Sequence, residues 1–321
     1  MMKIGRLAIA GCQGIAKHGW NVLSGLASLT LDFVSSNKIV NTGRIFFAAG
    51  LAGIGLQHFF FGQFIPVVVP LWPNWIPGRP FWVYCVGAVL LACAGAILSG
   101  IRARAAALLL GVLFLFSAVF LHIPAQLLKG ASTLGSWTDP FKALAFAGGA
   151  FVIAGTLPKA GDGRGLPSVT GPLEKLIPLG MYPLAIMVIV FGIDHFLSPV
   201  FVASLVPGWI PWHLFWAYFA GAALIASGVG MTVRMTARLA ATLLGVMIFL
   251  WVVMLHIPRA VADPYGAIGN EISSVFEALA FSGLAFILGQ TLSKKEWFLS
   301  REKAVSTDDE TYLDRKHSLG D

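Results

Sequence analysis

The sequence predicts an all-α membrane protein of eight transmembrane helices, arranged as two four-helix bundles that are parallel repeats of each other. Three observations predict this class. Apolar residues make up 57% of the chain, charged residues only 12%, and the mean hydropathy is +0.80, a balance that excludes an ordinary soluble domain. Continuous apolar runs are long enough to cross a hydrocarbon core of about 30 Å. The same short sequence words also recur in both halves of the chain.

The eight apolar runs are taken as the spans. They lie at 45–63, 81–100, 105–123, 141–157, 177–197, 213–231, 237–257 and 272–292. Because the runs are continuous rather than alternating, they predict helices and not strands.

The remaining segments are assigned around these spans. In order we expect an N-terminal segment (1–42), a first four-helix unit (43–157), a linker (158–175), a second four-helix unit (176–292) and a polar tail (293–321). The N-terminal segment is either a helix lying on the membrane surface or a poorly ordered tail. The Gly- and Pro-rich linker is expected to be a flexible cytoplasmic hinge, and the tail is expected to be disordered.

The positive charges predict the orientation. Most of the 22 lysines and arginines fall on one side of the spans, and cytoplasmic loops of membrane proteins are enriched in them. Both termini are therefore expected in the cytoplasm. The formal charge of +7 does not indicate a nucleic-acid partner, because the basic residues are scattered between apolar runs instead of forming one polar face.

The internal duplication is read from matched words. At an offset of 134, Trp75-Ile76-Pro77 falls on Trp209-Ile210-Pro211, and Leu121-His122-Ile123-Pro124 falls on Leu255-His256-Ile257-Pro258. The first helices align at 137 and the last at 135. An even number of spans in each unit makes the second copy enter the membrane from the same side as the first.

Four histidines are candidate ligand-binding residues: His58, His122, His195 and His256. Arg104 and His122 are 18 residues apart, about 27 Å of helix. The arginines are therefore expected at the cytoplasmic boundary and the histidines at the outer one. Two interpretations stay open: the histidines cap helix ends, or a pair in each unit hydrogen-bonds a quinone, ligates a haem or binds a metal. No recognised metal-binding motif is present in the sequence, so no metal site is predicted.

Glu277 is a further candidate because an ionisable group more than a turn inside a span is costly and is a functional candidate by default. Its partner could be His256, Arg259 or Lys142. Lys142 occupies the matching position in the first copy, so that pair would be a salt bridge between the units.

Asp194 is the other acid expected within the spans. It stands beside His195, where the first copy has Gln57. This difference places a single working site, if there is one, in the second unit.

The repeated unit carries an arginine ahead of a glycine-patterned first helix, a proline-rich outer loop and a basic turn into the third helix. In the first copy these features are Arg44, Gly50, Gly53, Gly55, His58, Arg102 and Arg104, and in the second Gly192, His195, Pro207, Pro211, Gly221, Arg234 and Arg238. With these residues the unit resembles the DoxX/DoxD superfamily of small four-helix membrane proteins over 43–157 and 177–292, although the tandem doubling departs from the usual single unit. The resemblance implies a plasma-membrane protein, since some relatives are small subunits of quinone-linked oxidoreductases, and it supplies no catalytic motif.

The leading functional prediction is therefore an accessory protein or subunit of a quinone-linked redox system in the plasma (inner) membrane. Its partners would be the lipid bilayer and a membrane oxidoreductase subunit, and its cofactor a quinone or a haem. A transporter or a lipid- or small-molecule-binding membrane protein is the alternative, and a structural scaffold is the third. Whether the chain is an enzyme, and which residues would be catalytic, stays open at this point.

Overall fold

The computed structural model describes residues 37–70, 72, 75–130, 132–158, 171–233 and 235–292, and all regular secondary structure within them is helical. The expected surface helix before residue 37, most of the linker and the polar tail lie outside the described residues. Of the linker, residue 158 and residues 171–175 are described, the latter including α7 (Gly171–Glu174).

The first half of the described chain forms four long helices joined by short elements. In order these are α2 (Asn37–Phe61), α3 (Arg79–Ser99), α4 (Ala103–Phe116), the π-helical turn η1 (Ser117–His122), α5 (Ile123–Leu128), the 3-10 turn η2 (Leu134–Trp137) and α6 (Thr138–Gly155). Glycines mark the ends of α3: Gly78 before it and Gly100 after it have φ angles of 74° and 77°. Glycine reverses the chain in this left-handed region without the steric cost of a side chain.

The second half has the same order of long helices. Its elements are η3 (Ile177–Leu179), α8 (Met181–Leu197), α9 (Pro199–Leu205), α10 (His213–Thr232), α11 (Ala237–Trp251), the π-helical turn η4 (Val252–His256), α12 (Ile257–Ala262), η5 (Gly266–Ile268) and α13 (Asn270–Thr291).

Seven helical stretches of the described chain are long and apolar enough to cross a membrane. They are Asn37–Phe61, Arg79–Ser99, Ala103–Leu128, Pro172–Leu197, His213–Thr232, Ala237–Ala262 and Gly266–Thr291. The eighth expected span, 141–157, lies largely within α6, most of whose residues are buried. Asp139 and Lys142 near the start of α6 lower its mean hydropathy, and it is not among the seven.

The helices that carry His122 and His256 each widen into a π-helical turn, immediately before an Ile-Pro pair. The N–H of Ile123 donates to the carbonyl of Ala118, and that of Ile257 to the carbonyl of Val252, five residues back in each case. A proline supplies no N–H and crowds the carbonyl four residues before it, so the wider turn relieves both problems at Pro124 and Pro258.

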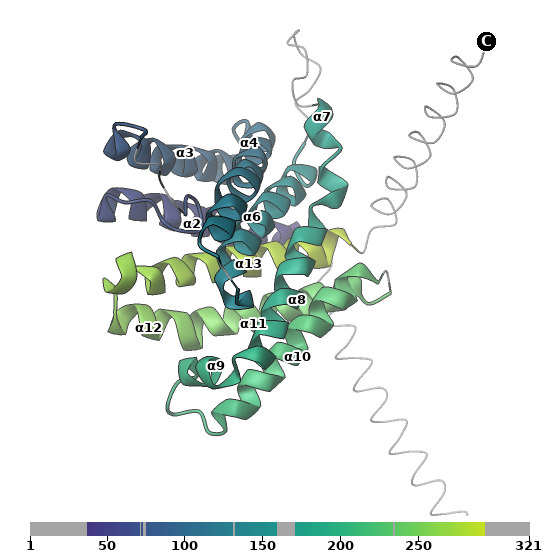
Figure 1. The fold of residues 1–321 in the computed structure, drawn as a ribbon. Coiled ribbons are helices and arrows are strands. Elements are labelled where there is room, and N and C mark those ends of the chain that lie inside the picture. Colours follow the sequence, from purple (N-terminus) through teal and green to yellow (C-terminus); the bar gives the residue numbers. More distant parts are fainter. Residues whose placement is uncertain are drawn as a thin grey trace, which may run out of the picture.

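The two halves pair crosswise (Figure 1). Within each half, neighbouring long helices pack in chain order, α2–α3–α4–α6 and α8–α10–α11–α13. Between the halves, α2 packs along α13 and α6 packs along α8, and α6 also contacts α13. The first helix of each half thus lies against the last helix of the other.

Glycines make this close approach of backbones possible. A Cβ atom on Gly43 would overlap the carbonyl oxygen of Gly283, and one on Gly283 would overlap that of Gly43. Gly148 and Gly180 stand in the same reciprocal relation where α6 crosses α8. Small residues at helix crossings are how membrane helices gain van der Waals contact without a hydrophobic driving force between them.

Long helices that follow each other in the chain run in opposite directions. The polar residues near their termini therefore gather at the two ends of the helix bundle. We call the end with His58, His122, His195 and His256 the histidine end, and the opposite one the arginine end. At the arginine end, Arg104 donates to the carbonyls of Ala154 (2.7 Å) and Leu157 (2.8 Å) and pairs with Glu174 of α7 (3.1 Å). Arg104 thereby places its positive charge at the C-terminal end of α6, where the helix dipole is negative.

Candidate functional site

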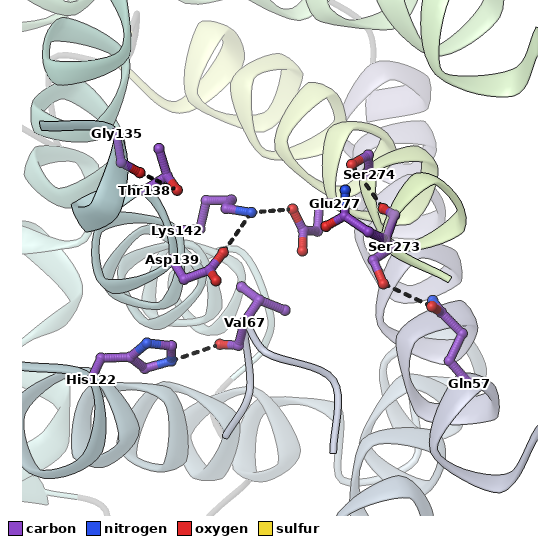
Figure 2. Close-up of polar contacts among 11 residues, drawn as sticks. Gln57, Val67, His122, Gly135, Thr138, Asp139, Lys142, Ser273, Ser274 and Glu277 are labelled. Carbon is purple, nitrogen blue, oxygen red and sulfur yellow. Dashed lines mark hydrogen bonds and ion pairs between the residues drawn. The ribbon is translucent and has the colours of Figure 1, made fainter. Parts of the chain in front are cut away.

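A cluster of three charged side chains joins the two halves where α6 meets α13 (Figure 2). Lys142 of α6 lies 2.8 Å from a carboxylate oxygen of Asp139 and 2.9 Å from a carboxylate oxygen of Glu277 on α13. We call Asp139, Lys142 and Glu277 the charged cluster. Of the three partners that the sequence offered for Glu277, the structure pairs it with Lys142.

The exposed fraction of the side chains decreases across the charged cluster. The side chain of Asp139 is 32% exposed, that of Lys142 18% and that of Glu277 9%. Arg259, which the sequence offered as another partner for Glu277, instead forms a two-pronged ion pair with Glu271, at 2.6 and 2.9 Å. A charge in an apolar interior is costly unless paired, and Lys142 is the cation that the structure places against the Glu277 carboxylate.

A hydrogen bond between uncharged side chains lies next to the charged cluster on α13. One turn before Glu277, the Ser273 hydroxyl donates to the side-chain oxygen of Gln57 on α2 at 2.8 Å, and both side chains are buried. The polar contacts between α13 and the first half therefore sit together at the histidine end.

A layer of phenylalanines closes the space beyond the cluster. Phe146 and Phe281 lie one turn further along α6 and α13, with ring centroids 4.6 Å apart. Phe114 of α4 stacks on Phe146 at 4.9 Å, and Phe47 of α2 lies 6.0 Å from it. The charged cluster therefore faces the histidine end and is separated from the arginine end by packed aromatic rings.

In the first half the histidines hold a buried loop. Residues 62–70 follow α2, and Phe64, Ile65, Val67, Val68 and Val69 are all buried. His58 Nδ1 donates to the carbonyl of Ile54 (2.8 Å), so its Nε2 accepts from the N–H of Ile65 (3.4 Å).

The other two ties to this loop come from η1. His122 Nε2 donates to the carbonyl of Val67 at 3.1 Å, and the Ser117 hydroxyl donates to the carbonyl of Val68. His58 and His122 are both fully buried. Both ring nitrogens of His58 are bonded, and the remaining nitrogen of His122, Nδ1, is buried, so neither ring presents a nitrogen to a space large enough for a haem.

The second half differs at the matching positions. The segment after α8 forms α9, of which only Ala203 is buried. His195 and His256 are partly exposed. His195 Nδ1 donates to the carbonyl of Phe191 (2.7 Å), as His58 does to Ile54, but its Nε2 has no partner among the described residues.

Trp251 completes this region. Its ring lies nearly parallel to that of His195, with centroids 6.5 Å apart and an interplanar angle of 19°. It takes the position that Ser117 has in the first half, at an offset of 134. His256 Nδ1 is buried without a hydrogen-bond partner in the described chain. We call His195, Trp251 and His256 the second-half histidine site.

Asp194, the acid next to His195 in the sequence, turns its carboxylate toward the first half. Its carboxylate oxygens lie 3.6 and 3.7 Å from where a Cβ on Gly135 would stand, so it faces η2 of the first half. The structure therefore brings Glu277 to the charged cluster and Asp194 to the neighbouring loop. Within the described residues, no group of three or more His, Cys, Asp and Glu side chains is arranged to hold a metal ion.

The sequence reasoning missed several of these residues. Asp139 carried a signal, because it precedes Lys142 by three residues and so shares its helix face. Ser117 and Trp251 carried none, since a serine and a tryptophan within apolar runs are ordinary. The buried course of the loop 62–70 was also missed.

Seven apolar helices of spanning length make this a multi-pass membrane protein in class. Residues 184–271 match the model of a family described as a domain of unknown function (DUF8561). The match runs from α8 to the first residues of α13, and so covers most of the second half. No curated protein and no solved structure matches the chain.

Proposed function

We propose that the chain is a protein of the plasma (inner) membrane built from two parallel four-helix repeats, with both termini in the cytoplasm. Three structural equivalences support the repeat. The crossing of Gly43 with Gly283 falls on that of Gly180 with Gly148 at offsets of 137 and 135, and the two π-helical turns correspond at 134. The close contacts of Gly111 with Phe151 and of Gly245 with Phe286 correspond in the same way.

The proposed orientation rests on the two ends of the bundle. Arg44 and Arg104 bind the last turn of α6 at the arginine end, as expected of a cytoplasmic boundary. At the histidine end Trp75, Trp209 and Trp212 are 81%, 72% and 78% exposed, as expected of indoles in the opposite membrane interface.

Within this frame we propose that the second repeat binds the headgroup of a quinone-class molecule, as an accessory subunit of a quinone-linked membrane redox system would. One observation carries the proposal. The loop that occupies His58 and His122 in the first half has no counterpart at His195 and His256, whose rings remain partly exposed.

The chemistry of the loop indicates what could take its place. It offers one donor, the N–H of Ile65, and acceptors, among them the carbonyl of Val67. A quinol or quinone headgroup offers hydroxyl and carbonyl oxygens on a flat ring, which His195 Nε2 and His256 could bind while Trp251 packs against the ring face. When bound, a quinone would supply two-electron redox chemistry, and these side chains would orient the headgroup.

The test uses the full chain purified in mild detergent. Co-purifying quinone is extracted and quantified, and binding of a short-chain quinol analogue is titrated by tryptophan fluorescence. His195→Phe retains an aromatic ring but loses the acceptor nitrogen, and it is expected to weaken binding about tenfold, the value of one hydrogen bond.

His58→Phe in the first half is the matched control. It should lower the midpoint of unfolding and leave the analogue affinity of the folded fraction unchanged, because His58 already serves the loop. If no quinone co-purifies and the analogue gives no saturable signal, the quinone assignment is wrong.

Transport of a small molecule is the second candidate function, and the charged cluster between the halves favours it, because sites of transporters lie at repeat interfaces. In this conformation the phenylalanine layer closes the path beyond Lys142 and Glu277. Transport would require Phe146 and Phe281 to separate, so uptake by proteoliposomes should fall sharply when cysteines placed at both positions are cross-linked, and should recover on reduction.

A further inference from the structure

The charged cluster carries more acceptors than donors. Asp139 and Glu277 bring four carboxylate oxygens, while Lys142 supplies one ammonium group that bonds to one oxygen of each. With all three side chains ionised, two negative charges face one positive charge. Counted as ionised groups, the cluster thus carries one net negative charge, and each carboxylate has a second oxygen for which no bond to Lys142 is found.

His122 adds a further acceptor, observed independently of the cluster. It is fully buried, and its Nε2 donates to the carbonyl of Val67, so the neutral ring presents a lone pair at Nδ1. That nitrogen is buried and has no hydrogen-bond partner in the described chain. A buried acceptor left unpaired costs free energy, which a donor placed beside it would recover.

His122 and the cluster belong to one electrostatic environment. Asp139, Lys142 and Lys129 are the charged groups near enough to act on the His122 ring. In the view of Figure 2, Asp139 lies between Lys142 and the His122 ring. Lys129 follows α5 and is exposed, and no bond from its side chain to the cluster or to His122 is found in the described part of the chain.

The charged cluster lies toward the histidine end. Asp139 is the most exposed of its three side chains and Glu277 the least exposed. The phenylalanine layer closes the far side. A ligand would therefore enter with its cationic group first and leave the rest of the molecule at the membrane boundary.

We propose that Asp139, Glu277 and His122 bind a primary ammonium group, which brings one positive charge together with several N–H donors. The group could belong to an aminophospholipid headgroup or to a free amine, and the site recognises the chemistry that both share. A quaternary ammonium group has the same charge and no N–H, so it satisfies the charge and leaves the acceptors unpaired.

The experiment measures the thermal midpoint of the full chain in detergent against methylammonium chloride, with tetramethylammonium chloride and sodium chloride at matched ionic strength. Methylammonium is expected to raise the midpoint saturably, because a ligand that binds only the folded state stabilises it. Asp139→Asn is expected to raise the half-saturating concentration about tenfold or more, the value of one charge-assisted hydrogen bond.

Asp263→Asn is the matched control. Asp263 is an exposed aspartate at the same end of the bundle, and its side chain accepts only from the N–H of Gly266. The substitution changes the net charge by the same amount and should leave the methylammonium response intact. Asp139→Asn should itself remain folded, because Lys142 still pairs with Glu277.

Two arms separate the sources of the ammonium group. The first arm compares the thermal midpoint in nanodiscs of phosphatidylethanolamine and of phosphatidylcholine. A higher midpoint in phosphatidylethanolamine for the wild type, but not for Asp139→Asn, identifies a lipid headgroup. A response to free methylammonium without a lipid effect identifies a soluble amine. The proposal is overturned if tetramethylammonium or sodium stabilises the wild type as well as methylammonium does, or if Asp139→Asn responds like the wild type.

Discussion

Replacing Lys142 by methionine is expected to destabilise the protein far more than removing either of its carboxylate partners. Lys142 is bonded to both Asp139 and Glu277, at 2.8 and 2.9 Å. Without it, Glu277 is left as an unpaired carboxylate with a side chain only 9% exposed. Breaking a buried pair in this way costs about 3–5 kcal/mol. Asp139, with a third of its side chain exposed, can turn to solvent and adds little.

The same ion-pair geometry predicts how much the single variant Glu277→Leu and the double variant lower the free energy of unfolding. Glu277→Leu leaves Lys142 paired with Asp139, so it is expected to cost about 1.5–3 kcal/mol, the value of one hydrogen bond between charged groups. The double variant Lys142→Met/Glu277→Leu removes both buried charges and should lie within about 1 kcal/mol of the wild type. The coupling between the two positions is therefore expected to exceed about 3 kcal/mol.

The free energy of unfolding is measured in mixed micelles by titration with sodium dodecyl sulfate, followed by tryptophan fluorescence. The four proteins of the cycle are compared at equal total detergent. The reasoning is refuted if Lys142→Met unfolds within about 1 kcal/mol of the wild type, or if the double variant is as unstable as Lys142→Met.

Three further predictions follow from the packing and the exposed surface. Gly148→Val should destabilise by about 1–3 kcal/mol in the same unfolding assay because its side chain would meet backbone, whereas Gly95→Val, with open space around it, should be nearly neutral; equal losses would contradict the packing. Ser117→Ala should loosen the loop 62–70, so that a cysteine placed at Val68 in a cysteine-free variant reacts faster with maleimide than it does with Ser117 present, and an unchanged rate would show that the bond does not hold the loop. Trp209, which is 72% exposed, should be quenched more strongly in liposomes by lipids brominated near the headgroup than by lipids brominated at the acyl-chain end, and the opposite order would place the histidine end at the wrong depth.

The long helices were predictable because continuous apolar runs of spanning length have few alternatives. The ends of the elements were less so: α2 begins at Asn37, within the segment assigned to the N-terminus. The crosswise pairing of α2 with α13 was not foreseen. Hydropathy tells which residues avoid water, and does not tell which of several apolar helices a given face will contact.

The candidate site was predictable where a charge stood out against an apolar background. The pair of Glu277 with Lys142 could be inferred because both are charged and stand at matched positions in the repeat. The histidines could not be resolved in the same way. His58 and His195 occur in similar surroundings in the sequence, and they differ because the segment after one folds inward as a loop while the segment after the other forms α9. That difference lies in tertiary packing.

The crosswise pairing of the halves has a consequence for their ancestry. On the proposed repeat, a single four-helix unit would have had to associate with an identical copy to cover the faces that α2 and α13 now cover for each other. In such a homodimer the positions of Lys142 and Glu277 would have carried the same residue, so that like charges, or no charges, faced each other across the symmetry axis. On the same proposal, joining the two copies in one chain would release these positions from identity and allow opposite charges to evolve. The ion pair between Lys142 and Glu277 favours packing of the first half against the second half. Packing of two first halves, or of two second halves, from different chains would bring equal charges together and is disfavoured.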